Sequence, residues 1–275
     1  MAKFSLTPEQ IASYQTDGYL FVHNFLQLNE VGKLQQIAFD DAVIRKHAFD
    51  LNDQSGKKTK LTLWYKPGND TYGLLTRGKR MVTSANQLLD GNGDVCHFHS
   101  KLMQKEPRVG GAWEWHQDYG YWYKNEFLFP DQMLSVMIAI TDANKANGCL
   151  QVIKGSHKMG RVEHGFAGEQ VGAAQRYVDL ALQTMELVYV ELKAGDALFF
   201  HPNILHRSEA NLSDTARWSL ISVYNRSSNT PYNEPSQSST IPVDVVPDEA
   251  LMEWSGSNME ESANFLTKEK DEALK

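Results

Sequence analysis

The feature that most limits the possible folds is the second half of the chain, where short apolar or alternating segments follow one another between turn residues. Short segments rich in β-branched and aromatic residues are typical of strands, and KANG and KAGD between them are turn signals. This succession favours an antiparallel β-sandwich or barrel. The segments are VCHFHSKLM, MLSVMIAITD, GCLQVI, MELVYVEL, DALFFHPNILHRS and RWSLISVYNR.

The N-terminal part of the chain has helix signals instead. Thr7 is a candidate N-cap, Pro8 suits the first helical position, and Gln10 completes a capping box. Gly18 is expected to end this helix, because glycine is common just past a helix C-terminus. The segment YLFVHNFL then predicts a short buried strand, and apolar residues at helical spacing predict a second helix after Asn29.

We expect one domain over residues 1–275. With 275 residues, 41% of them hydrophobic, the chain is long enough for a substantial core, and no linker-like stretch occurs before about residue 225. The N-terminal helices are expected over about residues 1–50, and one further helix over about 168–183 interrupts the strands. The polar tail, about 227–275, is expected to wrap the surface or to be partly disordered.

Charge and cysteine content exclude several classes of function. The net charge of -7 and the lack of a clustered basic face argue against a nucleic-acid partner. Only Cys96 and Cys149 occur, which fits a reducing compartment, so we expect a cytoplasmic protein. No apolar run approaches the roughly 20 residues that span a bilayer, so no membrane span is expected. The oligomeric state is not determined by these features.

The stretch WEWHQDYGYW places His116 and Asp118 one residue apart within a run of aromatic residues. In a regular strand, residues i and i+2 point to the same face, so this pair can offer two ligands to one metal ion. His206 in FFHPNILHRS is the candidate third ligand. Two histidines and one carboxylate are the facial triad of non-haem Fe(II) oxygenases. The His-x-Asp pair alone is more often a structural hydrogen-bonded pair, so the third ligand is essential.

Arg217 follows His206 by eleven residues and starts the next predicted strand. An inward-facing arginine in an apolar strand needs an anion, and its planar fork suits a carboxylate. His97 and His99 would share one face of an earlier strand, which suggests a metal pair. A place at the core edge or the surface fits these two residues better, with His99 able to border the pocket. His201 is expected at a strand end with a structural hydrogen bond, and His157 is expected to stabilise a turn.

The sequence resembles the phytanoyl-CoA dioxygenase family of Fe(II)- and 2-oxoglutarate-dependent oxygenases, which also includes ectoine hydroxylase. Four segments carry the resemblance, in the family's order and spacing: TPEQIASYQTDGYLFV, SKLMQKEPRVGGAWEWHQDYGYW, NGCLQVIKGSHKMG and GDALFFHPNILHRSEANLSDTARWSLISVYN. Together they cover most of the chain. They are specific for the family and carry no information about the substrate.

The resemblance implies roles for individual residues. His116, Asp118 and His206 match the family's iron ligands. Arg217 matches the partner of the distal carboxylate of 2-oxoglutarate, and Ser208 matches a residue that adds a hydrogen bond near that carboxylate.

Three further positions follow from the resemblance. Lys101 stands where the family lines the cosubstrate pocket, often with Met. His164 matches a second histidine downstream of the GSH motif that lies close to the site. Met137 stands where relatives often carry Trp, so the pocket wall is expected to differ here.

The resemblance implies a mainly β fold with flanking helices, a double-stranded β-helix of the jelly-roll, cupin-like type with iron between the sheets. It also implies Fe(II), 2-oxoglutarate and dioxygen, with ascorbate as an activator, and hydroxylation of an unactivated C–H bond of a small molecule with release of succinate and carbon dioxide. Asp118 favours hydroxylation over halogenation, because related halogenases lack this carboxylate. Two alternatives stay open: a non-catalytic jelly-roll module that binds a small molecule, and a cupin-like metalloenzyme that does not use 2-oxoglutarate.

Overall fold

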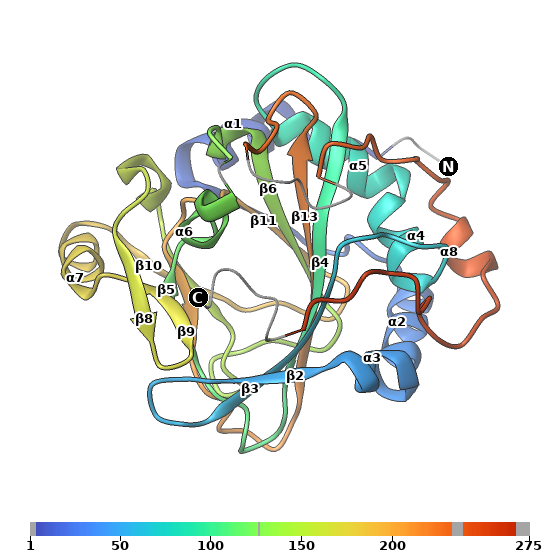
Figure 1. Cartoon of the computed structure of the whole chain (residues 1–275), viewed down its shortest axis with the longest axis horizontal. Helices are drawn as coiled ribbons and strands as arrows, with labels where there is room; N and C mark the ends of the chain where they lie inside the picture. The colour runs from blue at the N-terminus through green and yellow to red at the C-terminus, as the bar shows by residue number, and fades with distance from the viewer. Residues whose placement is uncertain (1–3, 126, 233–238, 268–275) are drawn as a thin grey trace.

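Two antiparallel sheets form the centre of the molecule (Figure 1). The computed structural model describes residues 4–125, 127–232 and 239–267. The larger sheet has the order β1 (Tyr19–Val22), β11 (Ala197–Phe200), β6 (Met133–Ala139), β13 (Arg217–Arg226), β4 (Val95–Lys105), β3 (Lys58–Trp64) and β2 (Phe49–Asn52). The smaller sheet has the order β10 (Leu187–Val190), β7 (Leu150–Ile153), β12 (His206–Ser208) and β5 (Trp113–His116). A separate hairpin pairs β8 (His164–Ala167) with β9 (Gln170–Ala173).

An apolar core fills the space between the two sheets. Met103, Met137 and Ile221 come from the larger sheet, whereas Leu150 and Val152 come from the smaller one. Alternation along each strand sends these side chains inward. The antiparallel β-sandwich predicted from the segment pattern is therefore confirmed, in its jelly-roll form.

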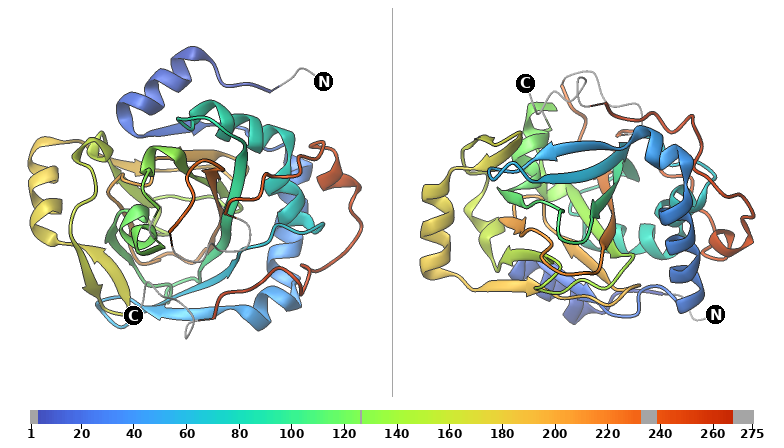
Figure 2. Two further views of the ribbon diagram at one scale, coloured as in Figure 1. Left: turned by 45° about the horizontal axis from the view of Figure 1, so that its top comes forward. Right: turned by 90° about the horizontal axis from the view of Figure 1, so that it is seen from below.

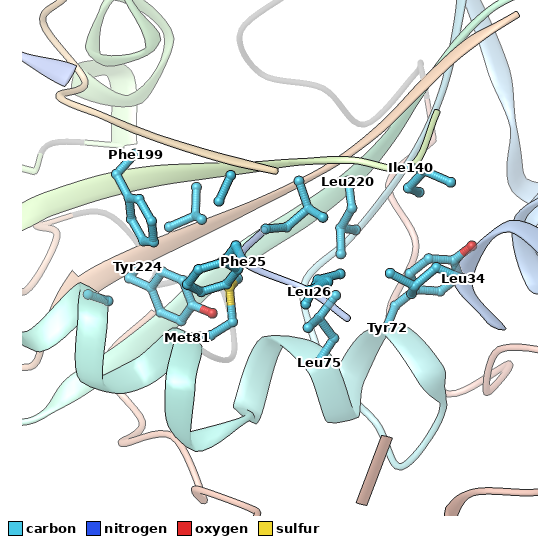
Figure 3. Close-up of a cluster of buried hydrophobic side chains, with 14 of the residues drawn as sticks. Phe25, Leu26, Leu34, Tyr72, Leu75, Met81, Ile140, Phe199, Leu220 and Tyr224 are labelled. Carbon is cyan, nitrogen blue, oxygen red and sulfur yellow. The ribbon is translucent and has the colours of Figure 1, made fainter. Parts of the chain in front are cut away.

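A second core lies on the other face of the larger sheet. Helices α2 (Leu28–Asp40), α4 (Thr71–Arg77) and α5 (Lys79–Leu88) cover this face (Figures 1 and 2). Leu34, Leu75 and Met81 pack there against Phe199, Leu220 and Tyr224 of the strands (Figure 3). Because both faces of the central strands are covered, β6, β11 and β13 are buried throughout. The larger sheet is therefore a rigid support for residues on its inner face.

The remaining helices are short or peripheral. They are α1 (Pro8–Asp17), α3 (Ala42–His47), α6 (Asp118–Trp122), α7 (Gln175–Thr184) and α8 (Ala250–Glu253), together with the 3-10 turns η1 (Tyr123–Asn125), η2 (Pro130–Gln132) and η3 (Ser156–Met159). Helix α1 has the predicted capping box between Thr7 and Gln10, and it ends at Gly18 in the left-handed conformation. No helix in the described ranges has the length and apolar character needed to cross a membrane.

Three sequence predictions need correction. The helix expected over 168–183 starts only at Gln175, because residues 170–173 pair with β8. The second helix starts at Leu28, with Gln27 and Glu30 forming its capping box, rather than after Asn29. The N-terminal helices were expected to end at about residue 50, but the structure adds strands β2 and β3 and helices α4 and α5 between them and β4. Their short segments lack the long periodic pattern that makes an element readable from sequence.

The described part of the tail packs on the molecule. Residues 239–267 form isolated bridges at Pro242, Val246 and Phe265 with the strands and helices that they cross. Four apolar side chains of this segment are buried, namely Leu251, Met259, Ala263 and Leu266. The expected wrapping of the surface fits this segment, while residues 233–238 and 268–275 of the predicted tail lie outside the described residues.

Candidate functional site

His116, Asp118 and His206 converge between the sheets. Strands β5 and β12 are neighbours, and His116 lies directly opposite His206 in their register. Nε2 of His116 lies 3.6 Å from Oδ1 of Asp118, and Nε2 of His206 lies 3.7 Å from the same oxygen. All three side chains are buried, and their ligand atoms lie within 4.8 Å of one another. The grouping predicted from the His-x-Asp pair and the distant histidine is therefore present in the structure.

The path by which Asp118 reaches the site differs from the strand prediction. Strand β5 ends at His116, Gln117 is extended, and Asp118 is the first residue of α6. Ser135 of β6 donates a 2.6 Å hydrogen bond from Oγ to Oδ2 of Asp118, which leaves Oδ1 facing the two histidines. The carboxylate is thus aimed by a helix start and a serine of the opposite sheet, and not by the alternation of a strand.

Both histidines are held in the orientation that a metal ligand requires. Nδ1 of His116 donates to the Glu114 carbonyl at 2.7 Å, and Nδ1 of His206 donates to the Ile204 carbonyl at 3.0 Å. Each Nε2 therefore keeps its lone pair toward Asp118. Burial lowers the pKa of His206 to about 3, and the neighbouring His116 contributes to this shift, so the imidazole is neutral at pH 7.

The donor set fits Fe(II). Burial opposes ionisation of Asp118, but Lys101, His206 and His116 together keep the pKa of its carboxyl below the ordinary value. Two imidazoles and one carboxylate are the ligands of the facial triad. Ligand atoms about 2.1 Å from one ion lie roughly 3.0 to 3.6 Å from each other, close to the separations from Asp118 seen here.

Arg217 and Lys105 place two buried cations at one end of the space between the sheets. They lie opposite each other on β13 and β4, and neither has a carboxylate within salt-bridge distance among the described residues. Nη1 of Arg217 donates to the Gly148 carbonyl at 2.8 Å, whereas its Nε is buried without a hydrogen-bond partner in the described structure. Burial lowers the pKa of Arg217 to about 10. A buried cation without a counter-charge is costly, so this pair needs an anion.

Sequence reasoning missed Lys105 and Ser219. Nζ of Lys105 donates to the carbonyls of Ser208 and Glu209, and burial, followed by the charge of Arg217, holds its pKa well below the usual range. Oγ of Ser219 is buried without a hydrogen-bond partner among the described residues, two positions from Arg217. Alternation from Arg217 would have found Ser219. Lys105 had a weaker signal, a lysine at the end of an apolar strand.

The other residues implied by the resemblance lie around this space. Nζ of Lys101 lies 4.0 Å from Oδ1 of Asp118, and 5.9 Å from the ring centre of Trp113. Ser208 is buried on β12, and Met137 packs in the core between the sheets. These positions are compatible with the predicted lining of a cosubstrate pocket, which stays a prediction for each residue.

His164 supports the backbone beside the metal ligands. Its Nδ1 donates to the Val162 carbonyl at 2.8 Å, and its Nε2 accepts the backbone N–H of Gln117 at 3.0 Å. The Gln117 side chain in turn joins the carbonyls of Gly160 and Asn203. Both ring nitrogens of His164 are therefore used within the protein, and burial lowers its pKa to about 4.

The remaining histidines have separate places. A bulge in β4 puts His97 opposite Tyr224 and His99 opposite Val223, so the two do not share a face as a regular strand would require. His97 bonds Ser100 and the Tyr65 carbonyl, whereas His99 lies against Trp122. The surface place that was one alternative for them is wrong, since both are buried. The structural hydrogen bond expected for His201 is confirmed, to Asp131. His157, expected to stabilise a turn, lies in the short turn η3 and bonds the Gln15 carbonyl of a distant segment instead.

Two facing antiparallel sheets with a buried His-x-Asp and distant His triad are typical of the class of non-haem Fe(II) oxygenases with a jelly-roll fold. The model of the phytanoyl-CoA dioxygenase (PhyH) family matches residues 14–219. The chain therefore belongs to this family of 2-oxoglutarate-dependent dioxygenases.

Individual relatives agree with this assignment. The chain is 30% identical to L-proline trans-4-hydroxylase of Streptomyces griseoviridis over 235 residues, 79% of this chain and 86% of that protein. It is 24% identical to ectoine dioxygenase of Bordetella parapertussis, over 82% of this chain and 77% of that protein.

Solved structures show the same fold. EctD from S. alaskensis in its apo form superposes with a TM-score of 0.71 at 21% identity, over 90% of each chain. The carbocyclase SnoK from nogalamycin biosynthesis superposes with a TM-score of 0.69 at 20% identity, over 94% of this chain and 95% of that one. Other structures of EctD contain bound Fe, or 2-oxoglutarate with 5-hydroxyectoine.

Proposed function

We propose that the protein hydroxylates an unactivated C–H bond of a small molecule. One atom of dioxygen enters the substrate as hydroxyl, and the other enters succinate as 2-oxoglutarate loses carbon dioxide. The observation that carries the proposal is the convergence of His116, Asp118 and His206 in a buried space that also holds Arg217 and Lys105, neither of which has a carboxylate within salt-bridge distance among the described residues. Fe(II), when bound, supplies the activation of dioxygen in such sites.

The protein's own residues would hold and orient the reactants. Arg217 offers to a carboxylate its Nε, which has no hydrogen-bond partner among the described residues, and Lys105 adds a second positive charge beside it. Ser219, two positions from Arg217, and Ser208, whose carbonyl accepts from Lys105, would add hydrogen bonds to the distal carboxylate of 2-oxoglutarate. The apolar side chains between the sheets exclude water from the reacting groups.

His164 and Met137 complete the proposed lining of the cosubstrate pocket, whereas Lys101, which the resemblance places in this lining, faces the metal ligand Asp118. Lys101 and His164 lie beside the metal ligands Asp118 and His116, and Met137 forms part of the apolar wall. Ascorbate would serve as an activator by keeping iron reduced. The presence of Asp118 favours hydroxylation over halogenation, since a halide needs the coordination position that this carboxylate takes.

The two alternatives are less compatible with the geometry. A non-catalytic binding module has no need for two imidazoles fixed with their Nε2 lone pairs toward one carboxylate. A cupin-like metalloenzyme that does not use 2-oxoglutarate has no need for the buried cations at Arg217 and Lys105. The free, buried thiols of Cys96 and Cys149 suit the cytoplasmic location that we propose.

The first test is anaerobic addition of Fe(II) and 2-oxoglutarate. We expect a weak visible metal-to-ligand charge-transfer band in the wild type and none in Asp118→Ala. Succinate release with iron, ascorbate and 2-oxoglutarate is then measured against a metabolite set that includes L-proline and ectoine, the compounds named for two relatives. A wild-type protein that binds Fe(II) but develops no band would contradict the proposal.

A further inference from the structure

The inner face of β4 and β13 carries charged groups at two separate places. Lys105 and Arg217 form one pair, and Lys101 lies opposite Ile221 four residues further along. Four residues of strand correspond to about 13 Å. Met103 and Ser219 occupy the positions between them. The cation at Lys101 is therefore a second feature, distinct from the proposed anchor of the distal carboxylate.

Lys101 has a single counter-charge in the described structure. Asp118 is the only carboxylate within 4.0 Å of its Nζ among the described residues, and the atom that faces it is Oδ1. This same oxygen lies 3.6 and 3.7 Å from the two histidine Nε2 atoms, so it is the atom placed to ligate a metal. With a metal ion bound, Asp118 shares its charge with that ion, and Lys101, whose side chain is only 13% exposed, lacks a full partner.

Regular strand alternation puts His99 next to Lys101 on the same side of the sheet, since the bulge in β4 comes only before His99. His99 lies opposite Val223, its ring centre is 5.7 Å from that of Trp122 and 6.3 Å from that of Tyr65, and it is 5% exposed. The His99 side chain makes no hydrogen bond to another described residue, and its ring nitrogens are not among the fully buried atoms that lack a partner. A buried imidazole in this state is placed to bond a ligand.

We propose, on the basis of the oxygenase function above, that Lys101 and His99 form the subsite for a carboxylate of the substrate. Lys101 supplies the charge, and His99 supplies one hydrogen bond. The aromatic rings of Trp113, Trp122 and Tyr65 around them suit a small apolar body attached to this carboxylate. Because Lys101 lies beside a metal ligand, only a few bonds separate the carboxylate from the carbon that reacts. The substrate class is therefore a small carboxylic acid, amino acids included.

The test separates a substrate role of Lys101 from a cosubstrate role. Anaerobic titration of 2-oxoglutarate against the charge-transfer band gives its dissociation constant in the wild type, Lys101→Met, Lys101→Arg and His99→Phe. Substrate-stimulated succinate formation is then compared between L-proline and L-prolinamide, and between further small amino acids and their primary amides. Lys60→Met is the matched control, since Lys60 lies on the adjacent strand opposite Gln104 and outside the site.

We expect the wild type to prefer acids over amides by about tenfold or more, since one buried charge pair is worth at least that factor. In Lys101→Met this preference should fall to near one, with 2-oxoglutarate binding within about twofold of the wild type. Lys101→Arg should keep most of the preference, His99→Phe should raise the KM for the acid, and Lys60→Met should match the wild type.

Three results would overturn the proposal. One is at least tenfold weaker 2-oxoglutarate binding in Lys101→Met with the acid preference kept, which would place Lys101 in the cosubstrate pocket. Another is a wild type that forms the band yet responds equally to acids and amides. The third is a wild type that forms the band and responds to no acid of the set. A wild type without the band would instead refute the oxygenase function itself.

Discussion

Arg217 of β13 and Lys105 of β4 lie directly opposite each other, so two buried cations share one end of the space between the sheets. The protein tolerates this arrangement in a region where each uncompensated charge is costly. An anion that binds there gains from both charges without water to screen them.

Arg217→Ala should raise the 2-oxoglutarate requirement far more than the iron requirement. Loss of one partner of a desolvated, charge-assisted pair costs about 2 to 5 kcal/mol, which corresponds to roughly thirtyfold to several thousandfold weaker binding. Anaerobic titration against the charge-transfer band measures the effect, and Arg217→Lys should rescue it only in part. Arg207→Ala is the control, because Arg207 neighbours His206 but bonds Gln151 and Glu209 outside the site. Equal affinities in the wild type and Arg217→Ala would assign the anchor to another residue.

Lys105→Met should weaken 2-oxoglutarate binding by about tenfold or more, because it removes the second charge from the same end of the site. The methionine keeps the volume of the lysine stem and removes only the ammonium. The unfolding temperature with and without 2-oxoglutarate, in the presence of Mn(II), gives an independent measure. A ligand that binds the folded protein raises this temperature, and a tighter ligand raises it more. An undiminished stabilisation by 2-oxoglutarate in Lys105→Met would show that Lys105 only supports the Ser208–Glu209 backbone.

Gly120→Ala should weaken metal binding although Gly120 donates no ligand. A Cβ at this position would lie 2.2 Å from Nε2 of His164, so the ring must move away from the Gln117 N–H that it accepts. Disturbing a group that supports metal ligands typically costs about tenfold to a hundredfold in affinity. Gly165→Ala is the matched control. Gly165 follows His164 in β8, and a Cβ there would meet nothing within 4 Å. Metal titration followed by protein fluorescence compares the two variants, and equal affinities would rule out this supporting role.

Acid should destabilise the apo protein in part through His97. Burial lowers the pKa of His97 to about 3 from its ordinary 6.5. Between these values the unfolded chain binds a proton that the folded protein does not, so the free energy of unfolding falls as the pH falls. The contribution is complete above pH 6.5 and is lost by about 1.4 kcal/mol per pH unit below it. Urea unfolding gives the free energy of unfolding at each pH between 7 and 5. In His97→Gln this free energy should fall less steeply with decreasing pH, by about one proton. An unchanged pH dependence would contradict the assignment.

Local patterns in the sequence identified much of the scaffold and the chemistry. The capping box at Thr7 and Gln10 predicted α1 correctly, because it depends on contacts within four residues. The strand segments after residue 95 were recognisable because each buries a face with period two. Helices α4 and α5 and the start of α7 were missed or misplaced, since short elements are decided by what they pack against and not by their own propensity.

The sequence by itself determined which residues could bind a metal, His116, Asp118 and His206, because ligand chemistry belongs to the side chains. Only the tertiary structure decided how they meet, through the pairing of β5 with β12 and the bond from Ser135 to Asp118. It alone revealed Lys105 opposite Arg217, and the bulge that separates His97 from His99. Register between distant strands depends on packing across the whole sheet, and a one-residue shift moves a side chain to the opposite face, so no local pattern could have fixed these neighbours.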